Sequence, residues 1–377
     1  MNLMYLLFSF TVGGTERLVA DICNEMINRK NKVYLYIVND LIDDDLIDSI
    51  DDNVTLELQR RTAGENKINT LIKIAQYIRI NKIDVVHCNS FDSPELLLLA
   101  KLISPRIKVI YTVHGMNQYK RLNIIRKIYR NIICDKIVGI SECVRSDLER
   151  NGAAKNKTEV VYNGIDLNKY KECNQRHYNE TETIVGCVAR IMPKVKGQDL
   201  LLEAANIIKN RGYSKFKFVF AGGVSESQRK EFQRLEEYVI ENELEEIISF
   251  IGNVTDVPGF MNSIDICVVP SRTEGFGLTL IEAMAMGVPC VAMDTEGPEE
   301  LIKKINIGDM FESGNSKSLA DKILEVDTVL CEKKKLCMKN KDIMKFASKL
   351  MELEKIIPIE VTRIQKDKHG MYLLISE

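Results

Sequence analysis

Short apolar runs of β-strand type alternate with longer helical patterns along most of this sequence. In the first half, strand candidates occupy residues 3–9, 33–38, 54–58, 84–87, 108–113, 136–139 and 159–162, with helical patterns between them, for example at 16–29, 68–80 and 121–133. A second series of strand candidates follows at residues 183–188, 216–220, 247–250, 266–269 and 289–292. Such alternation is typical of βα units that build parallel sheets. We therefore predict an α/β fold with two doubly wound, Rossmann-like sheets in tandem.

A polar segment without periodicity, KYKECNQRHYNETET at residues 169–183, separates the two series. The chain of 377 residues also exceeds the roughly 250–300 residues at which a single core stops growing. We expect an N-terminal domain at residues 1–172 and a C-terminal domain at residues 173–340.

Composition excludes several classes of protein. The chain has 52 Lys and Arg against 54 Asp and Glu, whereas nucleic-acid-binding proteins carry a marked basic excess. Its ten Cys include no C-x-x-C pair, which favours reduced thiols and a cytoplasmic location over a disulfide framework. The four His do not cluster with Cys or carboxylates at ligand spacing, so no metal site is predicted. No apolar stretch reaches the ~20 residues of a membrane span, and the N-terminus is interpreted as a first strand rather than a signal peptide.

A Gly pair, Gly13 and Gly14, opens the sequence GGTER after the first predicted strand. Glycine at a strand-to-helix turn lets the backbone approach a ligand, and the helix N-terminus behind it offers N–H groups to a phosphate. The sequence is neither a G-x-G-x-x-G fingerprint nor a Walker A loop. Taken alone, such a pair is more often only turn geometry.

Three cations lie at the equivalent turn of the second half, in ARIMPKVKG at residues 189–197: Arg190, Lys194 and Lys196. The carboxyl end of a parallel strand is where open α/β sheets bind ligands. The guanidinium of Arg and the ammonium of Lys both suit a diphosphate. A solvated basic loop is an equally good interpretation of this segment alone.

Two carboxylates eight positions apart, Glu274 and Glu282, flank a Gly-Phe-Gly turn in EGFGLTLIEAMAMGVP. We predict that Glu274 lies on a loop and Glu282 about one turn into the following helix, so that both reach one cleft. The backbone N–H groups of Leu278 and Thr279 at the helix start can bind a phosphate. The alternative, a surface carboxylate at position 282, fits this Gly-rich strand-turn-helix less well.

Together with Val113-His114-Gly115 and VYNGID at 161–166, these motifs make the chain resemble glycosyltransferase family 4. The resemblance runs from about residue 3 to residue 325 in one order. It implies the GT-B fold, in which two Rossmann-like domains face each other across a cleft, and retaining transfer from a nucleotide sugar.

The resemblance also implies roles for individual residues. Arg190 and Lys196 would hold the donor diphosphate, Glu274 the hydroxyls of the transferred sugar and Glu282 the ribose hydroxyls, while His114 would lie beside the reacting sugar. The catalytic residues would then be His114, Arg190, Lys196 and Glu274, without a metal or other cofactor. The donor-binding residues would be Gly13, Gly14, Asn253, Val254, Gly275, Phe276, Gly277, Leu278, Thr279 and Glu282.

The sequence departs from the family pattern at two places. The usual Gly-Gly-x-x-Glu is Glu296-Gly297-Pro298-Glu299-Glu300 here. A C-terminal helix that crosses back to the first domain is expected within residues 341–377, at about 342–355, but its aromatic pattern is faint and a further tail follows.

We expect a metal-independent, retaining hexosyltransferase that uses a nucleoside-diphosphate sugar, with UDP as its nucleotide, and a glycan or lipid-linked acceptor of surface polysaccharide biosynthesis. Alternatives are another GT-B enzyme, such as a sugar-phosphate synthase or a nucleotide-sugar epimerase, and a non-catalytic GT-B partner subunit. Retention of Arg190, Lys196, Glu274 and Glu282 speaks against the last.

The stretch from Lys120 to Arg130 carries five cations, no acid and apolar residues at helical spacing. A basic amphipathic helix can lie on an anionic membrane, which predicts peripheral attachment at the inner face of the plasma membrane. The alternative is an ordinary helix with its apolar face on the sheet and its cations in solvent.

Overall fold

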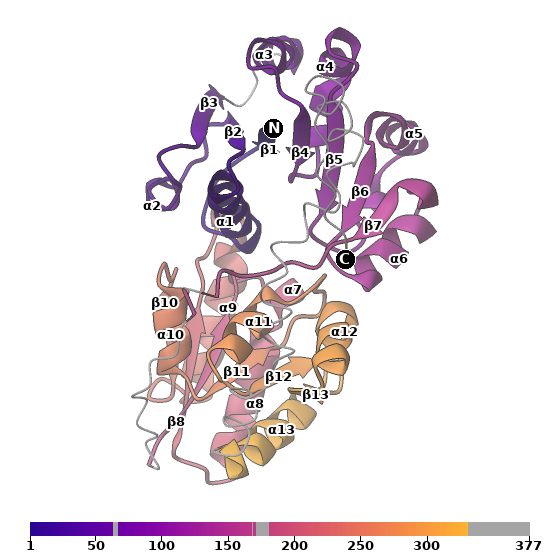
Figure 1. Ribbon diagram of the computed structural model, residues 1–377. Coiled ribbons are helices and arrows are strands. Elements are labelled where there is room, and N and C mark those ends of the chain that lie inside the picture. The colour runs from indigo at the N-terminus through magenta and orange to yellow at the C-terminus, as the bar shows by residue number, and fades with distance from the viewer. Residues whose placement is uncertain (63–66, 168, 171–180, 331–377) are drawn as a thin grey trace, which may run out of the picture.

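A computed structural model describes residues 1–62, 67–167, 169–170 and 181–330 of this chain. These residues form two parallel sheets, one in each half of the chain, which lie one above the other in Figure 1. Helices cover the faces of both sheets. The predicted α/β class with two tandem sheets is confirmed.

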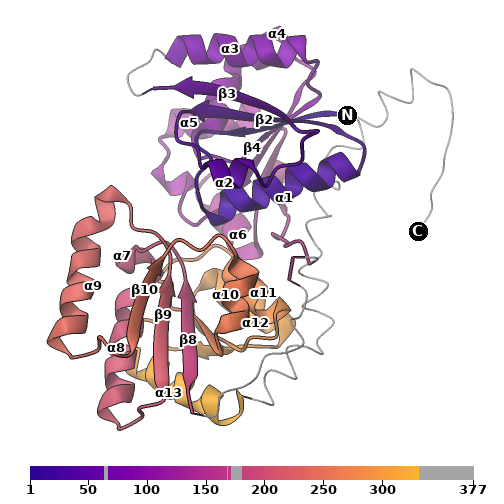
Figure 2. The same cartoon turned by 90° about the vertical axis from the view of Figure 1, so that its left-hand side faces the viewer.

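The N-terminal sheet has seven parallel strands in the order β3-β2-β1-β4-β5-β6-β7. The strands are β1 (Asn2–Leu7), β2 (Lys32–Asn39), β3 (Thr55–Arg61), β4 (Val85–Cys88), β5 (Lys108–Val113), β6 (Lys136–Gly139) and β7 (Thr158–Val160). The helices are α1 (Gly14–Asn28), α2 (Asp44–Ile47), α3 (Lys67–Ile80), α4 (Leu98–Ile103), α5 (Ile124–Ile133) and α6 (Glu142–Arg150), with 3-10 turns η1 (Ser93–Leu97), η2 (Tyr119–Arg121) and η3 (Lys155–Lys157). Figure 2 shows α1 and α2 on one face of this sheet and α3 and α4 on the other.

The C-terminal sheet has six parallel strands in the order β10-β9-β8-β11-β12-β13. The strands are β8 (Thr183–Val188), β9 (Phe216–Ala221), β10 (Ile248–Gly252), β11 (Ile266–Val269), β12 (Cys290–Met293) and β13 (Asp309–Phe311). The helices are α7 (Pro193–Lys196), α8 (Gln198–Asn210), α9 (Arg229–Glu241), α10 (Val257–Ser263), α11 (Leu278–Ala285), α12 (Glu296–Ile305) and α13 (Ser316–Thr328), with the 3-10 turn η4 (Glu226–Gln228).

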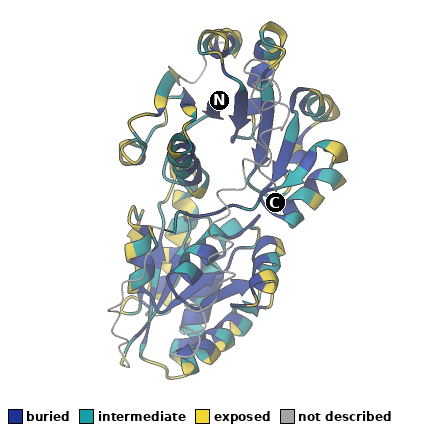
Figure 3. Ribbon diagram, viewed as in Figure 1, coloured by how far each residue is buried: buried dark blue, intermediate teal, exposed yellow. Residues whose placement is uncertain are grey.

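The central strands are apolar on both faces because helices cover the sheets from both sides. In β11 and β12 every residue is buried, and β1 is buried from Leu3 to Leu7. Figure 3 shows this burial along the strands of both sheets. Such two-sided burial explains why these strands read in the sequence as continuous apolar runs rather than as alternating patterns.

Each sheet reverses its strand order at one point. The chain proceeds outward from β1 to β2 and β3 and then returns to β4 on the other side of β1; β8 stands in the same relation to β9, β10 and β11. A doubly wound sheet opens a crevice at the carboxyl ends of its strands at such a point. The segments after β1 and β8 hold the first two predicted phosphate-binding motifs.

The structure also contains elements that the sequence did not reveal. The sixth strand of the second sheet, β13, has three residues and only one of them is buried, and α4 has six residues. Elements this short carry too little periodicity to be recognised. The helix expected at 342–355 lies outside the described residues.

Candidate functional site

One cleft lies between the two halves of the chain, at the carboxyl ends of both sets of strands. It brings together residues from segments far apart in the sequence. Of the residues predicted from the sequence, the cleft is lined by Gly13, Gly14, His114, Arg190, Lys196, Asn253, Val254, Glu274, Phe276, Gly277, Leu278, Thr279 and Glu282. Gly275 lies outside this lining, as does Lys194 of the predicted basic loop, which pairs with Glu231.

On the C-terminal side, Lys196 lies at the end of α7 and contacts Glu274. Its Nζ is 2.7 Å from Oε2 of the carboxylate, and both side chains are mostly buried. Gly197, which follows at a φ of 68°, makes this contact possible because a Cβ there would lie 1.9 Å from the carbonyl oxygen of Pro270. Only glycine permits so close an approach between α7 and the end of β11.

The loop that carries Glu274 is fixed to α7 and α8 by Arg272. Its backbone N–H donates to the carbonyl of Val195 over 2.8 Å. Its guanidinium makes two 2.7 Å bonds to the carboxylate of Asp199 and a third to the carbonyl of Pro193. Bidentate pairing of this kind fixes the orientation of the two groups as well as balancing their charges. Arg272 therefore fixes the backbone segments that carry Lys196 and Glu274 next to each other.

Helix α11 begins at the cleft. Gly277 precedes it in the left-handed region at a φ of 96°, which favours glycine, and Leu278 and Thr279 form the first turn. The first N–H groups of a helix lack intrahelical partners, and the helix dipole places partial positive charge there. This end of α11 is therefore suited to an anion.

Glu282 lies one turn further along α11. The hydroxyl of Tyr170 donates a 2.8 Å hydrogen bond to its Oε1. Burial raises the pKa of Glu282, and the Tyr170 hydrogen bond and the charge of Arg17 oppose that rise. Burial outweighs these two neighbours, so the pKa of Glu282 stays above its ordinary value.

The N-terminal side contributes a second helix N-terminus. Helix α1 starts at Gly14, after Gly13. A Cβ on Gly13 would lie 2.4 Å from Oε2 of Glu16, and one on Gly14 would lie 3.6 Å from Cδ1 of Leu278, the first residue of α11. The N-termini of α1 and α11 therefore approach the same part of the cleft from opposite sides.

His114 follows β5 and is oriented by Asn89, which follows β4. Its Nε2 lies 3.1 Å from Oδ1 of Asn89, whose Nδ2 donates to the carbonyl of His87. Since that donation leaves Oδ1 as the acceptor, His114 carries its proton on Nε2 and presents Nδ1 as an acceptor. Burial lowers the pKa of His114 to about 4, so the ring is neutral near pH 7.

Arg17 is a cleft residue that sequence reasoning did not select, although it belongs to the GGTER motif. Its Nη2 donates over 2.9 Å to the carbonyl of Val254 in the other half of the chain. Tyr170 was missed as well, because it lies in the polar segment between the two strand series. For Arg17, the sequence signal that could have identified it was its position in the first turn after a Gly pair.

Gly275 faces the N-terminal half rather than the cleft. Its carbonyl accepts a 2.6 Å hydrogen bond from the hydroxyl of Ser141, and a Cβ on it would lie 3.3 Å from Cα of Gly115. The glycine is explained by this close approach of two backbones.

Among the described residues, no group of three or more His, Cys, Asp and Glu side chains is placed to hold a metal ion. In the same part of the chain, no helix combines the length and the apolar character needed to traverse a bilayer.

Comparison with known families matches both halves of the chain. The family described as Glycosyltransferase Family 4 matches residues 12–169, and the family described as Glycosyl transferases group 1 matches residues 169–327. Together the two matches cover most of the described residues and include every residue assigned above to the cleft.

Several curated relatives are named as glycosyltransferases. An uncharacterized glycosyltransferase of Methanocaldococcus jannaschii is 30% identical over 254 residues, which are 65% of this chain and 65% of that protein. The O-antigen biosynthesis glycosyltransferase WclY of Escherichia coli is 25% identical over 86% of this chain and 88% of its own. An Escherichia coli UDP-Gal:alpha-D-GlcNAc-diphosphoundecaprenol alpha-1,3-galactosyltransferase is 26% identical over 77% of this chain and 81% of its own.

Solved structures share the fold. The crystal structure of Anabaena HepE in complex with UDP-glucose superimposes with a TM-score of 0.76, at 19% identity, over 94% of this chain and 99% of that one. At this identity the likeness concerns the fold: two α/β domains of GT-B type.

Proposed function

The chain belongs to glycosyltransferase family 4, and we propose that its cleft binds a UDP-sugar and transfers the hexosyl group, with retention of configuration and without a metal, to a glycan or lipid-linked acceptor of surface polysaccharide biosynthesis. The observation that carries the proposal is the convergence of Arg190, Lys196 and the N-termini of α1 and α11 on one cleft. Relatives named for O-antigen biosynthesis and for a UDP-galactose donor, and a fold neighbour in complex with UDP-glucose, support the choice of donor and pathway class.

The departing nucleoside diphosphate develops negative charge as the glycosidic bond to it breaks. Arg190 and Lys196 are fixed cations at the cleft, and the two helix N-termini add N–H donors. Preorganised donors and cations of this kind stabilise developing charge without reorganisation. We assign the diphosphate to this group of residues, the ribose hydroxyls to Glu282 and the base to the backbone at Asn253 and Val254.

We assign the binding of the transferred sugar's hydroxyls to Glu274 and His114. Because His114 is neutral with Nδ1 as its free acceptor, we assign it to accepting a hydrogen bond from a hydroxyl rather than to donating a proton as an acid. Glu274 is already paired with Lys196, so the carboxylate that we assign to the sugar lies beside a cation that we assign to the diphosphate.

For the chemical step we favour displacement on one face of the sugar, in which the acceptor hydroxyl attacks as the diphosphate leaves and the leaving phosphate oxygen takes the acceptor proton. The competing mechanism makes Glu274 a nucleophile. A Glu274→Ala variant distinguishes them: loss of hydroxyl contacts leaves measurable turnover, whereas loss of a nucleophile abolishes the reaction.

The deciding experiment is hydrolysis of several UDP-sugars and other nucleotide sugars by the wild type, Glu282→Ala and Lys196→Ala. Lys194→Ala is a matched control, because Lys194 is two residues away and points its exposed side chain to Glu231. We expect the first two variants to lose activity and the control to keep it. Equal activity in all four proteins would refute the site assignment.

We propose in addition that α5 attaches the enzyme to the anionic inner face of the plasma membrane, from a cytoplasmic location. Four isoleucines of α5 are more than half exposed: Ile124, Ile125, Ile128 and Ile132. The exposed cations Lys120 and Arg121 precede them, and the helix contains no acid. The alternative of an apolar face packed on the sheet is therefore wrong for these four side chains.

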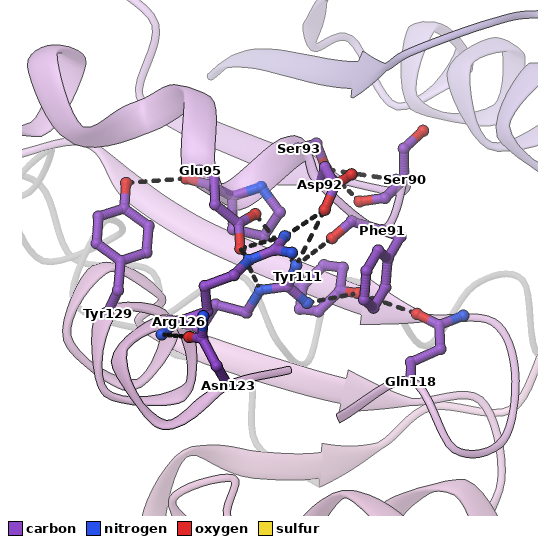
Figure 4. A network of polar contacts seen from close by, with 12 residues as sticks. Ser90, Phe91, Asp92, Ser93, Glu95, Tyr111, Gln118, Asn123, Arg126 and Tyr129 are labelled. Atoms are coloured by element: carbon purple, nitrogen blue, oxygen red, sulfur yellow. Dashed lines mark hydrogen bonds and ion pairs between the residues drawn. The ribbon is translucent and has the colours of Figure 1, made fainter. Parts of the chain in front are cut away.

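A polar anchor explains the orientation of α5. Arg130 is fully buried, and its guanidinium bonds to Glu95, to the hydroxyl of Tyr111 and to the carbonyl of Phe91. Arg126, one turn earlier, pairs with Asp92 and Glu95, as Figure 4 shows. Because these two arginines occupy the inner face of the helix, the isoleucines lie on the outer face.

Co-sedimentation with vesicles tests this attachment. We expect the wild type to bind vesicles that contain anionic lipid and an Ile125→Ser/Ile128→Ser variant to bind at least about tenfold more weakly, given ~1.5–3 kcal/mol for burial of one such side chain. Ile240→Ser, at an exposed isoleucine of α9 in the other half, is the control. Equal binding by all three proteins, or none by the wild type at any salt concentration, would refute it.

A further inference from the structure

The first turn of α6, in the N-terminal half, donates two hydrogen bonds to a residue in the C-terminal half. The backbone N–H of Glu142 donates to Oε1 of Glu300 over 3.1 Å, and that of Cys143 donates to Oε2 over 2.9 Å. Glu300 lies on α12, 158 residues further along the chain than Glu142. One carboxylate thus bonds to two consecutive amides of the facing domain.

These two amides need such a partner. The first N–H groups of a helix have no acceptor within it, and a side chain at the N-cap position normally supplies one. The N-cap of α6 is Ser141, whose hydroxyl accepts from the backbone N–H of Val144 and leaves the N–H groups of Glu142 and Cys143 to Glu300. Glu300 therefore completes the capping of α6 from the opposite domain, and its charge lies at the positive end of the helix dipole.

Other contacts keep the carboxylate charged and in place. The side chain of Glu300 is 14% exposed, and Oε1 also accepts a 2.7 Å hydrogen bond from the hydroxyl of Tyr162. Lys304 lies 3.4 Å from Oε1 and also contacts that hydroxyl. Burial opposes ionisation, but these bonds together hold the pKa of Glu300 below its ordinary value.

The same helix supports the segment of the predicted site that carries Glu274. The N–H of Gly297, at the start of α12, donates to the carbonyl of Glu274 over 3.1 Å. A Cβ on Gly297 would lie 2.5 Å from the backbone nitrogen of Phe276. On its other side, Gly275 contacts Gly115 and Ser141. Residues 274–276 are therefore held between α12 and the N-terminal half.

We propose that Glu300 is a positioning residue whose carboxylate caps α6 across the domain interface and thereby sets the position of His114 relative to Glu274. His114 precedes Gly115, which touches Gly275, while Glu274 precedes Gly275 on the facing loop. Loss of the cap frees the two domains to separate at this point, and the reacting groups that each domain contributes lose their alignment.

Hydrogen exchange resolved to single amides tests the cap without any substrate. In Glu300→Ala we expect the amides of Glu142 and Cys143 to exchange at least about tenfold faster, since a hydrogen bond to a charged group contributes ~1.5–3 kcal/mol. Amides from Arg145 onward, which bond within α6, keep their rates. Glu300→Gln, which retains one oxygen acceptor, gives an intermediate effect, and Glu299→Gln on the same helix gives none.

Turnover separates positioning from structural support. We expect Glu300→Gln to lower kcat at least about tenfold, by misalignment of the two domains, while its dissociation constant for UDP, bound mainly by the C-terminal half, changes little. Faster exchange along the whole of α6, or a UDP affinity that falls as much as kcat, would mean that Glu300 only stabilises the fold. Unchanged exchange at Glu142 and Cys143 in Glu300→Ala would refute the cap outright.

Discussion

The hydroxyl of Tyr170 donates its hydrogen to Oε1 of Glu282 over 2.8 Å. Tyr170 follows the N-terminal sheet and Glu282 lies in the C-terminal half, so a residue from one half of the chain supports the carboxylate that we assign to the ribose. Removal of that hydrogen bond raises the pKa of Glu282 further above its ordinary value, because burial already raises it and this bond opposes the rise.

A Tyr170→Phe variant should therefore lose UDP affinity at a higher pH than the wild type. A group with a raised pKa gains its proton earlier as the pH falls, and a protonated carboxyl accepts ribose hydroxyls less well. The ratio of variant to wild-type affinity, measured by calorimetry from pH 8.5 to 5, should fall with the pH. Tyr238→Phe on α9 is a remote control, and a ratio that does not depend on pH would contradict the prediction.

Removal of Glu274 from its ion pair with Lys196 should strengthen the binding of UDP and lower turnover. In Glu274→Ala, Lys196 loses the carboxylate 2.7 Å away, and its charge becomes available to a diphosphate. UDP, which has no sugar, should bind up to about fivefold more tightly, since a partly exposed ion pair contributes ~0.2–1 kcal/mol. Turnover of the UDP-sugar should fall, because the sugar loses Glu274.

The double variant Lys196→Ala/Glu274→Ala completes the cycle. It should bind UDP as weakly as Lys196→Ala alone, because the gain in Glu274→Ala acts through Lys196. Weaker UDP binding by Glu274→Ala than by the wild type would show that Glu274 contacts the nucleotide itself.

The hydrogen bond between His114 and Asn89 leads to a prediction about pH dependence. Burial lowers the pKa of His114 to about 4, so its protonation should not limit activity between pH 5 and 8. In Asn89→Asp a carboxylate faces Nε2 and favours the charged ring. The pH profile of kcat for this variant should gain an acidic limb at a higher pH than that of the wild type; identical profiles would contradict the proposed contact.

The sequence was sufficient for the architecture and for most of the cleft. Strands such as β1 and β11 are buried on both faces and therefore appear as apolar runs, and the loops after β8 and β11 meet because these strands are neighbours in the sheet. Lys196 and Glu274 are 78 positions apart, and the family resemblance assigned them to one site. The structure brings them together because each follows one of these two strands.

Contacts between the two halves could not be predicted in this way. The bonds of Arg17 to Val254, Tyr170 to Glu282 and Glu300 to the first turn of α6 depend on how the two sheets face each other. No local pattern encodes that arrangement. For a similar reason, the sequence pattern of α5 did not decide which of its faces is exposed to solvent. Arg130 is buried because it pairs with Glu95, which lies on another element.

The buried side chain of His87, on β4, should make the protein less stable at acidic pH. The ring is 6% exposed, and its Nε2 lies 2.7 Å from Oγ1 of Thr112. Burial, with a smaller effect of His114, lowers the pKa of His87 from 6.5 to about 3. Between these two values the unfolded chain binds a proton that the folded chain does not. The free energy of unfolding therefore falls as the pH decreases from about 6.5 toward 3.

For this single group, the expected loss between pH 7 and pH 5 is about 2 kcal/mol. A His87→Gln variant has no titrating ring at this position, so its stability should decrease less over the same interval, by about that amount. Urea denaturation at pH 7 and pH 5 measures the free energy of unfolding of both proteins. Comparison of the change between the two pH values removes the pH-independent effect of the substitution itself. An equal decrease in the two proteins would mean that His87 is solvated or charged in the folded state.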